Sequence, residues 1–178
     1  MRASLVELNA RWEERIGEVT DVSIGINTGP AQVGNIGSRR KFKYGALGTT
    51  VNLSSRVQGA TKYLGAPFLV TESTAKQLDA RFSTRRLCSV RTVNIPHPVV
   101  IFEVADAPNA QWAELKRRYE LALNLFEHAK FHEALPILGA LAHEFPQDDP
   151  TVLLLKRNVA DLRTIPSEFD PVWELGNK

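Results

Sequence analysis

The sequence predicts an α+β fold followed by an all-helical extension, and two patterns carry that prediction. Through residues 1–107, stretches that alternate apolar and polar residues, as strands do, are mixed with stretches whose apolar residues recur every three or four positions, as in helices. From Pro108 and Asn109 onward only the helical spacing is found. We therefore expect two domains, a sheet covered by helices over 1–107 and a helical tail over 108–178.

The composition narrows the class of protein. Of the 178 residues, 43% are hydrophobic and 24% are charged, as in ordinary globular chains. Residues 1–107 hold 14 Lys and Arg against 9 Asp and Glu, so this part is the better partner for an anionic ligand. The single cysteine, Cys88, allows no internal disulfide and favours a reducing compartment. No apolar run approaches the ~20 residues of a membrane span, so we expect no membrane contact from this segment. We expect a cytoplasmic location, or the cytosolic part of a membrane-anchored sensor.

The first elements follow from spacing and from glycine and proline positions. An amphipathic helix is expected over residues 3–16, ended by Gly17. Residues 22–28 alternate and predict a strand, and residues 31–36 predict a second strand or one side of a wide hairpin. Residues 39–43, R-R-K-F-K, are predicted as a basic loop. The apolar positions that define the helix are Leu5, Leu8, Trp12 and Ile16.

A longer helix is expected in the middle of the first domain. Thr49 or Thr50 can cap its N-terminus, and it should run to about Tyr63, with Gly65 ending it. Its buried stripe is predicted to consist of Val51, Leu53, Val57, Ala60 and Leu64. A buried strand, a short helix and two further strands are then predicted over residues 67–71, 72–78, 81–93 and 99–104.

The tail is predicted to contain three helices, because apolar stripes are separated by turn residues. The segment A-L-N-L-F-E-H-A-K-F-H-E-A-L resembles one tetratricopeptide-type helix pair. One such pair buries too little apolar surface to be stable alone, so we expect it to pack on the first domain or on a partner.

Asn52 and Arg56 are the first candidate site residues. Their spacing of four places both side chains on one face of the predicted helix. The guanidinium offers a planar set of donors suited to phosphate oxygens, and the amide offers both a donor and an acceptor. Spacing alone does not separate such a site from a solvated helix face.

Other polar motifs have ordinary structural interpretations. The glycine-rich N-T-G-P-A-Q-V-G-N-I-G-S could cradle phosphate, but it matches neither the P-loop nor the dinucleotide pattern, so a hairpin with turns is the alternative. The cations at 39–43 have no accompanying nucleic-acid module, so no nucleic-acid partner is expected. His128 and His132 lack a third ligand and are predicted to be surface residues, and Asp148 is predicted to cap a helix.

Taken in order, the motifs are more specific. I-G-I-N-T-G-P-A-Q-V-G-N-I-G-S followed by Y-G-A-L-G-T-T-V-N-L-S-S-R-V-Q-G resembles the second half of a class III adenylate/guanylate cyclase catalytic domain, over about residues 1–105. The resemblance implies an incomplete ferredoxin-like nucleotide cyclase core that dimerises head to tail, with active sites between subunits. It implies a nucleoside triphosphate substrate, ATP or GTP, and Mg²⁺ or Mn²⁺ in the complete domain.

The resemblance also implies roles for particular residues. Asn52 and Arg56 match the catalytic pair, in which the amide orients the ribose and the guanidinium neutralises charge that develops on the phosphates. Gly45, Leu47, Asn52 and Arg56 are the expected nucleotide-binding residues. Gly45 stands where relatives carry a purine-selecting side chain, so the sequence does not choose between ATP and GTP.

The departures from the family pattern lead to two hypotheses. The metal-binding aspartates would precede the helix at 3–16, so this chain is expected to hold no metal ligands and to be inactive alone. Val93 and Ile95 fill positions where relatives have lysines, and Arg91 is the nearest cation. The chain is therefore either the C-terminal half of a cyclase or a degenerate, non-catalytic interaction module.

Overall fold

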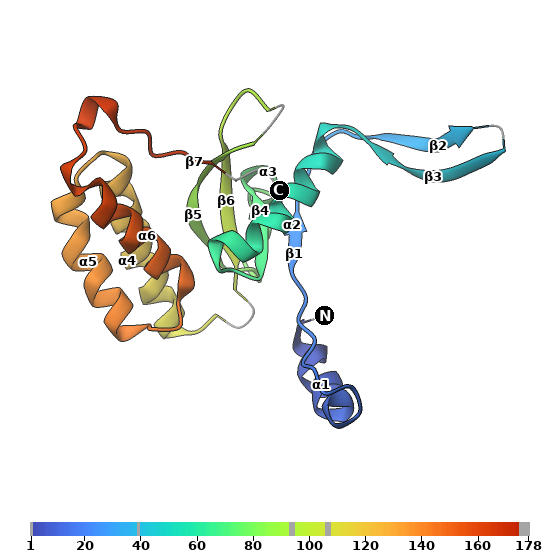
Figure 1. The fold of residues 1–178 in the computed structure, drawn as a ribbon, viewed down its shortest axis with the longest axis horizontal. Coiled ribbons are helices and arrows are strands. Elements are labelled where there is room, and N and C mark those ends of the chain that lie inside the picture. The colour runs from blue at the N-terminus through green and yellow to red at the C-terminus, as the bar shows by residue number, and fades with distance from the viewer. Residues whose placement is uncertain (1, 39, 93–94, 106–107, 175–178) are drawn as a thin grey trace.

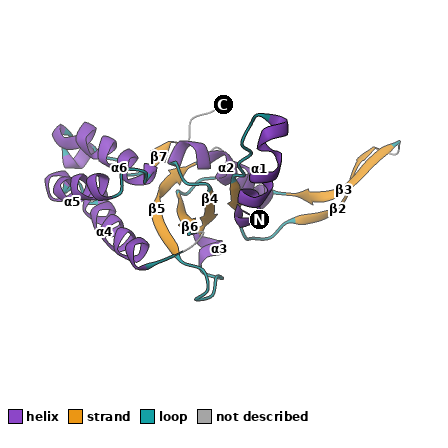
Figure 2. Ribbon diagram, turned by 90° about the horizontal axis from the view of Figure 1, so that it is seen from below, coloured by secondary structure: helices purple, strands orange, loops and turns teal. Residues whose placement is uncertain are grey.

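The computed structural model describes residues 2–38, 40–92, 95–105 and 108–174. Its centre is a mixed sheet, with a helical tail on one side and a long hairpin reaching away on the other (Figure 1). A view from below shows the same arrangement, with the tail and the hairpin at opposite ends of the molecule (Figure 2). The predicted mixture of strands and helices is confirmed, but the expectation of an all-helical tail is wrong, because the tail includes a short strand, Trp173–Glu174, that joins the sheet.

The sheet has five strands in the order β1-β4-β6-β5-β7. Their bounds are β1 (Ile24–Ile26), β4 (Phe68–Thr71), β6 (Val99–Val104), β5 (Thr84–Arg91) and β7 (Trp173–Glu174). The inner strands pair antiparallel, whereas β1 and β7 pair parallel to their neighbours at the two edges. One edge strand, β7, therefore comes from the far end of the chain.

Helices α2 (Thr49–Leu64) and α4 (Ala110–Glu127) pack against this sheet, and α5 (Phe131–Glu144) and α6 (Asp149–Ala160) pack on other helices. Helix α2 lies along β1 and β4, and a short helix α3 (Glu72–Ala75) follows β4. The tail helices are α4, α5 and α6, and α4 packs beside β5. Two single 3₁₀ turns, at Asp161–Arg163 and Pro166–Glu168, lead from α6 to β7. No helix within the described ranges is long and apolar enough to cross a membrane.

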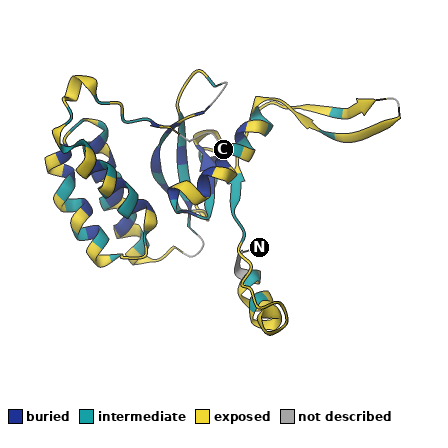
Figure 3. Ribbon diagram, viewed as in Figure 1, coloured by how far each residue is buried: buried dark blue, intermediate teal, exposed yellow. Residues whose placement is uncertain are grey.

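Two elements project from the core and leave apolar side chains in solvent (Figure 3). They are α1 (Arg2–Ile16) and the hairpin of β2 (Gln32–Ser38) with β3 (Lys41–Leu47). The exposed large apolar residues on them include Val6, Leu8, Trp12, Ile16, Val33, Ile36, Phe42, Tyr44 and Leu47. Such surfaces typically mark contacts with another chain or segment.

The hairpin corrects one sequence expectation. The basic loop predicted at 39–43 is wrong from Lys41 onward, because β3 begins there and pairs antiparallel with β2 from Ser38↔Lys41 to Gln32↔Leu47. Cations suggested a loop, but Lys41 and Lys43 alternate with Phe42 and Tyr44, which is the spacing of a strand.

The start of α2 corrects a second sequence expectation, namely that Thr49 or Thr50 caps this helix. The cap residue is Gly48, with φ of 131°, and it offers no side-chain hydrogen bond. Thr49 and Thr50 already lie within the helix. The Thr50 hydroxyl donates instead to the carbonyl of Pro30, at 2.6 Å, and so joins the helix to the segment after β1. The C-terminal prediction is confirmed, because Gly65 follows the helix in the left-handed conformation, with φ of 67°.

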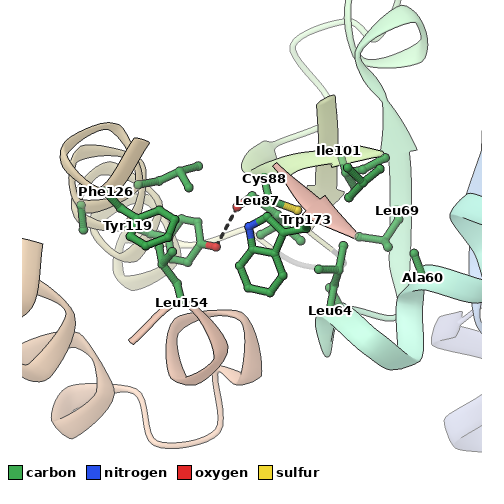
Figure 4. Packing of buried hydrophobic residues seen from close by; sticks show 14 of the residues in the cluster. Ala60, Leu64, Leu69, Leu87, Cys88, Ile101, Tyr119, Phe126, Leu154 and Trp173 are labelled. Atoms are coloured by element: carbon green, nitrogen blue, oxygen red, sulfur yellow. Dashed lines mark hydrogen bonds between the residues drawn. The ribbon is translucent and has the colours of Figure 1, made fainter. Parts of the chain in front are cut away.

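A single apolar cluster runs from the sheet and α2 into the tail. Its middle contains Leu64 from α2, Leu87 from β5, Tyr119 from α4 and Leu154 from α6 (Figure 4). The Tyr119 hydroxyl donates to the carbonyl of Leu87 at 3.0 Å, which ties the first tail helix to the sheet. The tail is thus packed on the sheet, as expected for a helix group too small to be stable alone. The domain boundary near residue 107 stays a prediction.

Arg85 is a fully buried cation at this junction, with 0% of its surface exposed. Its guanidinium donates to Glu103 on β6 at 2.6 Å and 2.9 Å and to Asp148 at 2.7 Å and 2.8 Å. It also lies 4.7 Å from the centre of the Tyr119 ring. Burial acts to lower the pKa of Arg85, but the two carboxylates outweigh that effect and hold the pKa above its ordinary value.

Asp148 has two roles at the junction. It is the N-cap of α6, where its carboxylate accepts from the Thr151 backbone N–H at 3.2 Å, so the predicted capping role is confirmed. The same carboxylate accepts the Thr151 hydroxyl and the Arg85 guanidinium. A capping residue therefore also carries the ion pair between tail and sheet.

Breaking this ion pair should destabilise the whole chain. Arg85→Met leaves Glu103 and Asp148 largely buried without their cation, so we expect the free energy of unfolding to fall by about 3–5 kcal/mol. Urea denaturation followed by circular dichroism measures this change. Arg81→Met is the matched control, because Arg81 pairs with Asp79 in solvent and its loss should change little. Equal stabilities of the two variants would contradict the assigned role.

Cys88 should be unreactive in the folded chain. Burial raises the pKa of its thiol from 9.0 to about 12, so at pH 8 the thiol is neutral and inaccessible. We expect a disulfide reagent to modify it at pH 8 only as fast as the chain unfolds, and immediately in urea. Because the folded pKa is the higher one, the linked stability is complete below about pH 9 and is lost as the pH rises towards 12. Rapid modification of the folded chain at pH 8 would contradict this burial.

Candidate functional site

The predicted site residues lie on one strand–turn–helix unit. Gly45 and Leu47 are near the end of β3, and Asn52 and Arg56 are one turn apart on α2, which begins right after Gly48. Leu47 and Asn52 are exposed, whereas Gly45 and Arg56 are half-buried. The four positions thus lie on consecutive elements, and their nucleotide-binding roles stay predictions.

Two glycines let α2 lie directly on β1. A Cβ atom on Gly25 would be 2.1 Å from the backbone nitrogen of Gln58 in α2, and one on Gly29 would be 2.9 Å from the Thr50 hydroxyl. The Ser54 hydroxyl donates to the Gly25 carbonyl at 3.1 Å. These glycines of the G-I-N-T-G segment therefore have a packing role: no other residue fits under the helix without moving it.

Asn27 is a positioning residue that the sequence interpretation missed. Its side-chain N–H donates to the Thr50 carbonyl in the first turn of α2 at 3.0 Å. Its side-chain oxygen accepts from Thr71 at the end of β4, at 2.8 Å, and from Ser73 at 3.2 Å. One amide therefore connects β1, α2 and β4 at the edge of the sheet from which α2 starts.

Hydroxyl groups extend this connection. The Ser73 hydroxyl donates to the Thr28 carbonyl at 2.9 Å, and the Thr28 and Thr74 hydroxyl oxygens are 2.9 Å apart. Thr74 is buried and Thr28 is exposed, so the network runs from the core to the surface. A short polar residue just after a strand was the available signal for Asn27, but its three partners are distant in sequence.

Arg91 lies where β5 pairs with β7 at one edge of the sheet, whereas α2 packs on β1 and β4 at the other edge. It ends β5, and its guanidinium donates to Asp170 at 3.0 Å and to Glu174 on β7. The hydrogen bonds that Arg91 donates, first to Glu174 and then to Asp170, raise the pKa of Arg91 above its ordinary value. The idea that Arg91 replaces a missing phosphate-binding lysine stays a prediction. Of the two lysine positions, Ile95 is half-buried and Val93 lies outside the described residues.

The remaining polar candidates form no second site in the described part of the chain. His128, His132 and His143 are all exposed, as predicted for His128 and His132, and the ring of His128 is 2.8 Å from the Asn124 carbonyl in its own helix. The described ranges contain no group of three or more His, Cys, Asp or Glu that could hold a metal ion. A metal ligand set is therefore not supplied by these residues.

Comparison with known proteins identifies the class. Residues 1–97 match the family described as the adenylate and guanylate cyclase catalytic domain. This match covers more than half of the chain, so the chain belongs to that family. The predicted family is thereby confirmed over residues 1–97, whereas the roles of Asn52 and Arg56 and the tetratricopeptide-like nature of the tail stay predictions.

The particular relatives are cyclases from several organisms. Over 152 residues, 82% of this chain, it is 27% identical to the terminal-differentiation specific adenylate cyclase of Dictyostelium discoideum, of which this covers 7%. Adenylate cyclase 1 of Rhizobium meliloti (strain 1021) is 31% identical over 48% of this chain and 13% of its own length. The adenylate cyclase of Anabaena cylindrica is 34% identical over 47% of this chain and 17% of its own. The chain thus spans less than a fifth of these curated relatives.

Solved structures show the same fold. The adenylyl cyclase CyaB from P. aeruginosa matches with a TM-score of 0.51 and 25% identity, over 61% of this chain and 55% of its own. The guanylyl cyclase Cya2 matches with a TM-score of 0.50 and 30% identity, over 61% of this chain and 54% of its own. One neighbour is thus an adenylyl cyclase and the other a guanylyl cyclase.

Part of the tail is shared as well. The match to the Dictyostelium relative covers 82% of this chain. A continuous stretch of that length includes residues 33–146 whether it lies near the start or the end of the chain, so it spans both α4 and α5. The Dictyostelium relative is consequently similar in sequence over the segment that forms these helices.

The packing of α2 on β1 leads to a paired test. Gly25→Ala places a methyl group against the α2 backbone, so we expect a loss of at least about 1–3 kcal/mol in unfolding free energy and shifted amide NMR signals along α2. Gly59→Ala lies in the same helix with no atom within 4 Å of the new Cβ, and it should gain about 0.5–1 kcal/mol. A neutral Gly25→Ala would show that α2 does not sit this close to β1.

Proposed function

We propose that this chain supplies the Asn–Arg side of a nucleotide cyclase active site, which forms a 3′,5′-cyclic nucleotide and pyrophosphate from ATP or GTP in intracellular signalling. The observation that carries the proposal is the placement of Asn52 and Arg56, one turn apart, on a helix fixed by Gly25 and Asn27. Membership of the cyclase family and the activities named for the relatives support it.

Each residue has a physical role in this proposal. Arg56 stabilises negative charge that builds on the phosphates as the ribose 3′-oxygen attacks, and Asn52 orients the ribose. Both roles require fixed side chains, which is what a helix packed on the sheet offers. Leu47 presents apolar surface to the nucleotide. Gly45 has no side chain to read a purine, so selection of ATP or GTP is assigned to other groups.

The metal and the partner subunit come from outside this set of residues. The complete domain would use Mg²⁺ or Mn²⁺, but the described residues do not fit such an ion, so no step is routed through one. We propose that the ligands lie on another segment, that two copies pair head to tail, and that this chain alone is inactive. The exposed apolar residues Val33, Phe42 and Tyr44 of the hairpin support pairing with a further chain.

The proposal also covers the fold of the tail and the cellular location of the chain. Antiparallel packing of α4 on α5 supports a tetratricopeptide-like helix pair, carried as a domain over 108–178 after a cyclase domain over 1–107. We propose a cytoplasmic location for this part of the protein, with no nucleic-acid partner.

The proposal is tested in the complete protein that contains this chain. We expect Arg56→Ala to lower kcat by about 10²–10³-fold and to change KM much less, because its charge partner develops in the transition state. Product is measured from ATP and from GTP separately. Lys62→Ala is the matched control, since Lys62 is an exposed cation two turns further along the same helix. An unchanged kcat for Arg56→Ala would remove this residue from the mechanism.

A second assay separates the two functional hypotheses. The 178-residue chain alone should form no cyclic nucleotide from ATP or GTP with Mn²⁺, and the complete protein should form it. Product from the chain alone would refute the proposal that the metal ligands lie elsewhere. A folded but inactive complete protein would favour the non-catalytic interaction module.

A further inference from the structure

We propose that residues 169–174, here called the C-terminal clamp, hold the helical tail against the last turn of α2 and so fix the helix that carries Asn52 and Arg56. The contacts of the clamp lie within this chain and do not depend on the proposed function. Its consequence for catalysis rests on the proposed function of α2. Trp173 is then a positioning residue, which acts through Tyr63.

Trp173 is the anchor of the clamp on the sheet side. It is 7% exposed, and its backbone pairs with Val90 where β7 joins the edge of β5. Its indole meets the Tyr63 ring of α2 edge to face, with centroids 6.0 Å apart and an interplanar angle of 87°. Figure 4 shows Trp173 between Leu64 of α2 and Tyr119 of α4. The side chain therefore contacts both the catalytic-domain helix and the tail.

Arg157 of α6 holds the clamp on the tail side. Its guanidinium donates to three successive backbone carbonyls, those of residues 170, 171 and 172, at 2.7 Å, 3.2 Å and 3.2 Å. The same group lies 4.8 Å from the Trp173 ring centre and 5.3 Å from that of Phe126. At the start of the clamp, Phe169 packs edge to face on Phe126 and Phe131, at 5.0 Å and 4.8 Å. The clamp thus moves with the tail helices.

The end of α2 is gripped by a second tail contact. A Cβ atom on Gly65, which caps α2, would be 2.2 Å from the Cβ of Asp149 at the start of α6. The last turn of α2 is therefore held between α6 and Trp173, while Asn27 holds its first turn. Asn52 and Arg56 lie between these two supports on one 16-residue helix. Loosening the clamp end would therefore leave this helix supported only near its first turn, which lets both side chains shift.

Arg91 adds an electrostatic contact to the clamp. It bridges Asp170 and Glu174, and its side chain is 48% exposed. Salt screens ion pairs that are this exposed to solvent, so these pairs add little to the stability of the clamp. The burial of Trp173 provides most of that stability.

Hydrogen exchange of the 178-residue chain tests the clamp without any enzyme activity. Trp173→Ala should speed exchange of the α2 amides at residues 61–64 by roughly tenfold or more, through local opening. Trp173→Phe should restore slow exchange, because the Trp173 indole N–H is buried with no hydrogen-bond partner among the described residues, so the aromatic contact is what matters. Faster exchange confined to residues 161–174 would overturn the proposal.

The reciprocal variant keeps the test decisive if Trp173→Ala fails to fold. Tyr63 is 48% exposed, so Tyr63→Ala should leave the fold intact while it speeds exchange at residues 172–174. Lys62→Ala, in the same turn, is the control and should change nothing. No effect of Tyr63→Ala on the clamp would also overturn the proposal.

Activity of the complete protein tests the consequence. Trp173→Ala should lower kcat by roughly tenfold with KM nearly unchanged, and Trp173→Phe should retain kcat. An unaltered kcat in Trp173→Ala, where exchange at α2 is fast, would overturn the positioning role. A wild-type protein without activity would instead overturn the proposed function, and the exchange results would still decide whether the clamp exists.

Discussion

The buried Arg85 is the constraint on which the arrangement of sheet and tail depends. Burying a guanidinium is costly unless its charge is neutralised and its N–H groups are hydrogen-bonded. For Arg85, the partners are a carboxylate from β6, a second carboxylate from the N-cap of α6 and the face of the Tyr119 ring. Each partner belongs to a different element. The ion pair can form only in one arrangement of these elements, so it specifies how the tail docks as well as stabilising it.

Helix α2 depends on the same principle of close fit. Glycines on its sheet side bring its backbone against β1, and Asn27 connects its first turn to two strands. Asn52 and Arg56, one turn apart on this helix, are consequently carried on a support with little freedom. An active site that stabilises a transition state requires this kind of preorganisation.

The helices and the candidate pair, Asn52 and Arg56, could be predicted from local patterns in the sequence. The bounds expected for α2 are close to those observed, because an apolar stripe and Gly65 define them without reference to the rest of the chain. Features that depend on contacts between distant parts of the chain could not be predicted from the sequence. An arginine on a strand suggests an exposed position, and Arg85 is buried only because Asp148, 63 residues away, meets it. The partners of Asn27 are likewise set by the topology. The first part of strand β3, Lys41–Lys43, was assigned to a loop because its lysines outweighed the alternation around them.

The double role of Asp148 has an evolutionary consequence. A residue that both begins a tail helix and neutralises a cation in the sheet cannot be inherited with only one of the two modules. Recombination that joined this sheet to a different C-terminal module would leave Arg85 without its second carboxylate, and a transplanted tail would lack the cation that Asp148 needs. The two parts should therefore be transmitted as one genetic unit, although the sequence pattern predicts a boundary between them.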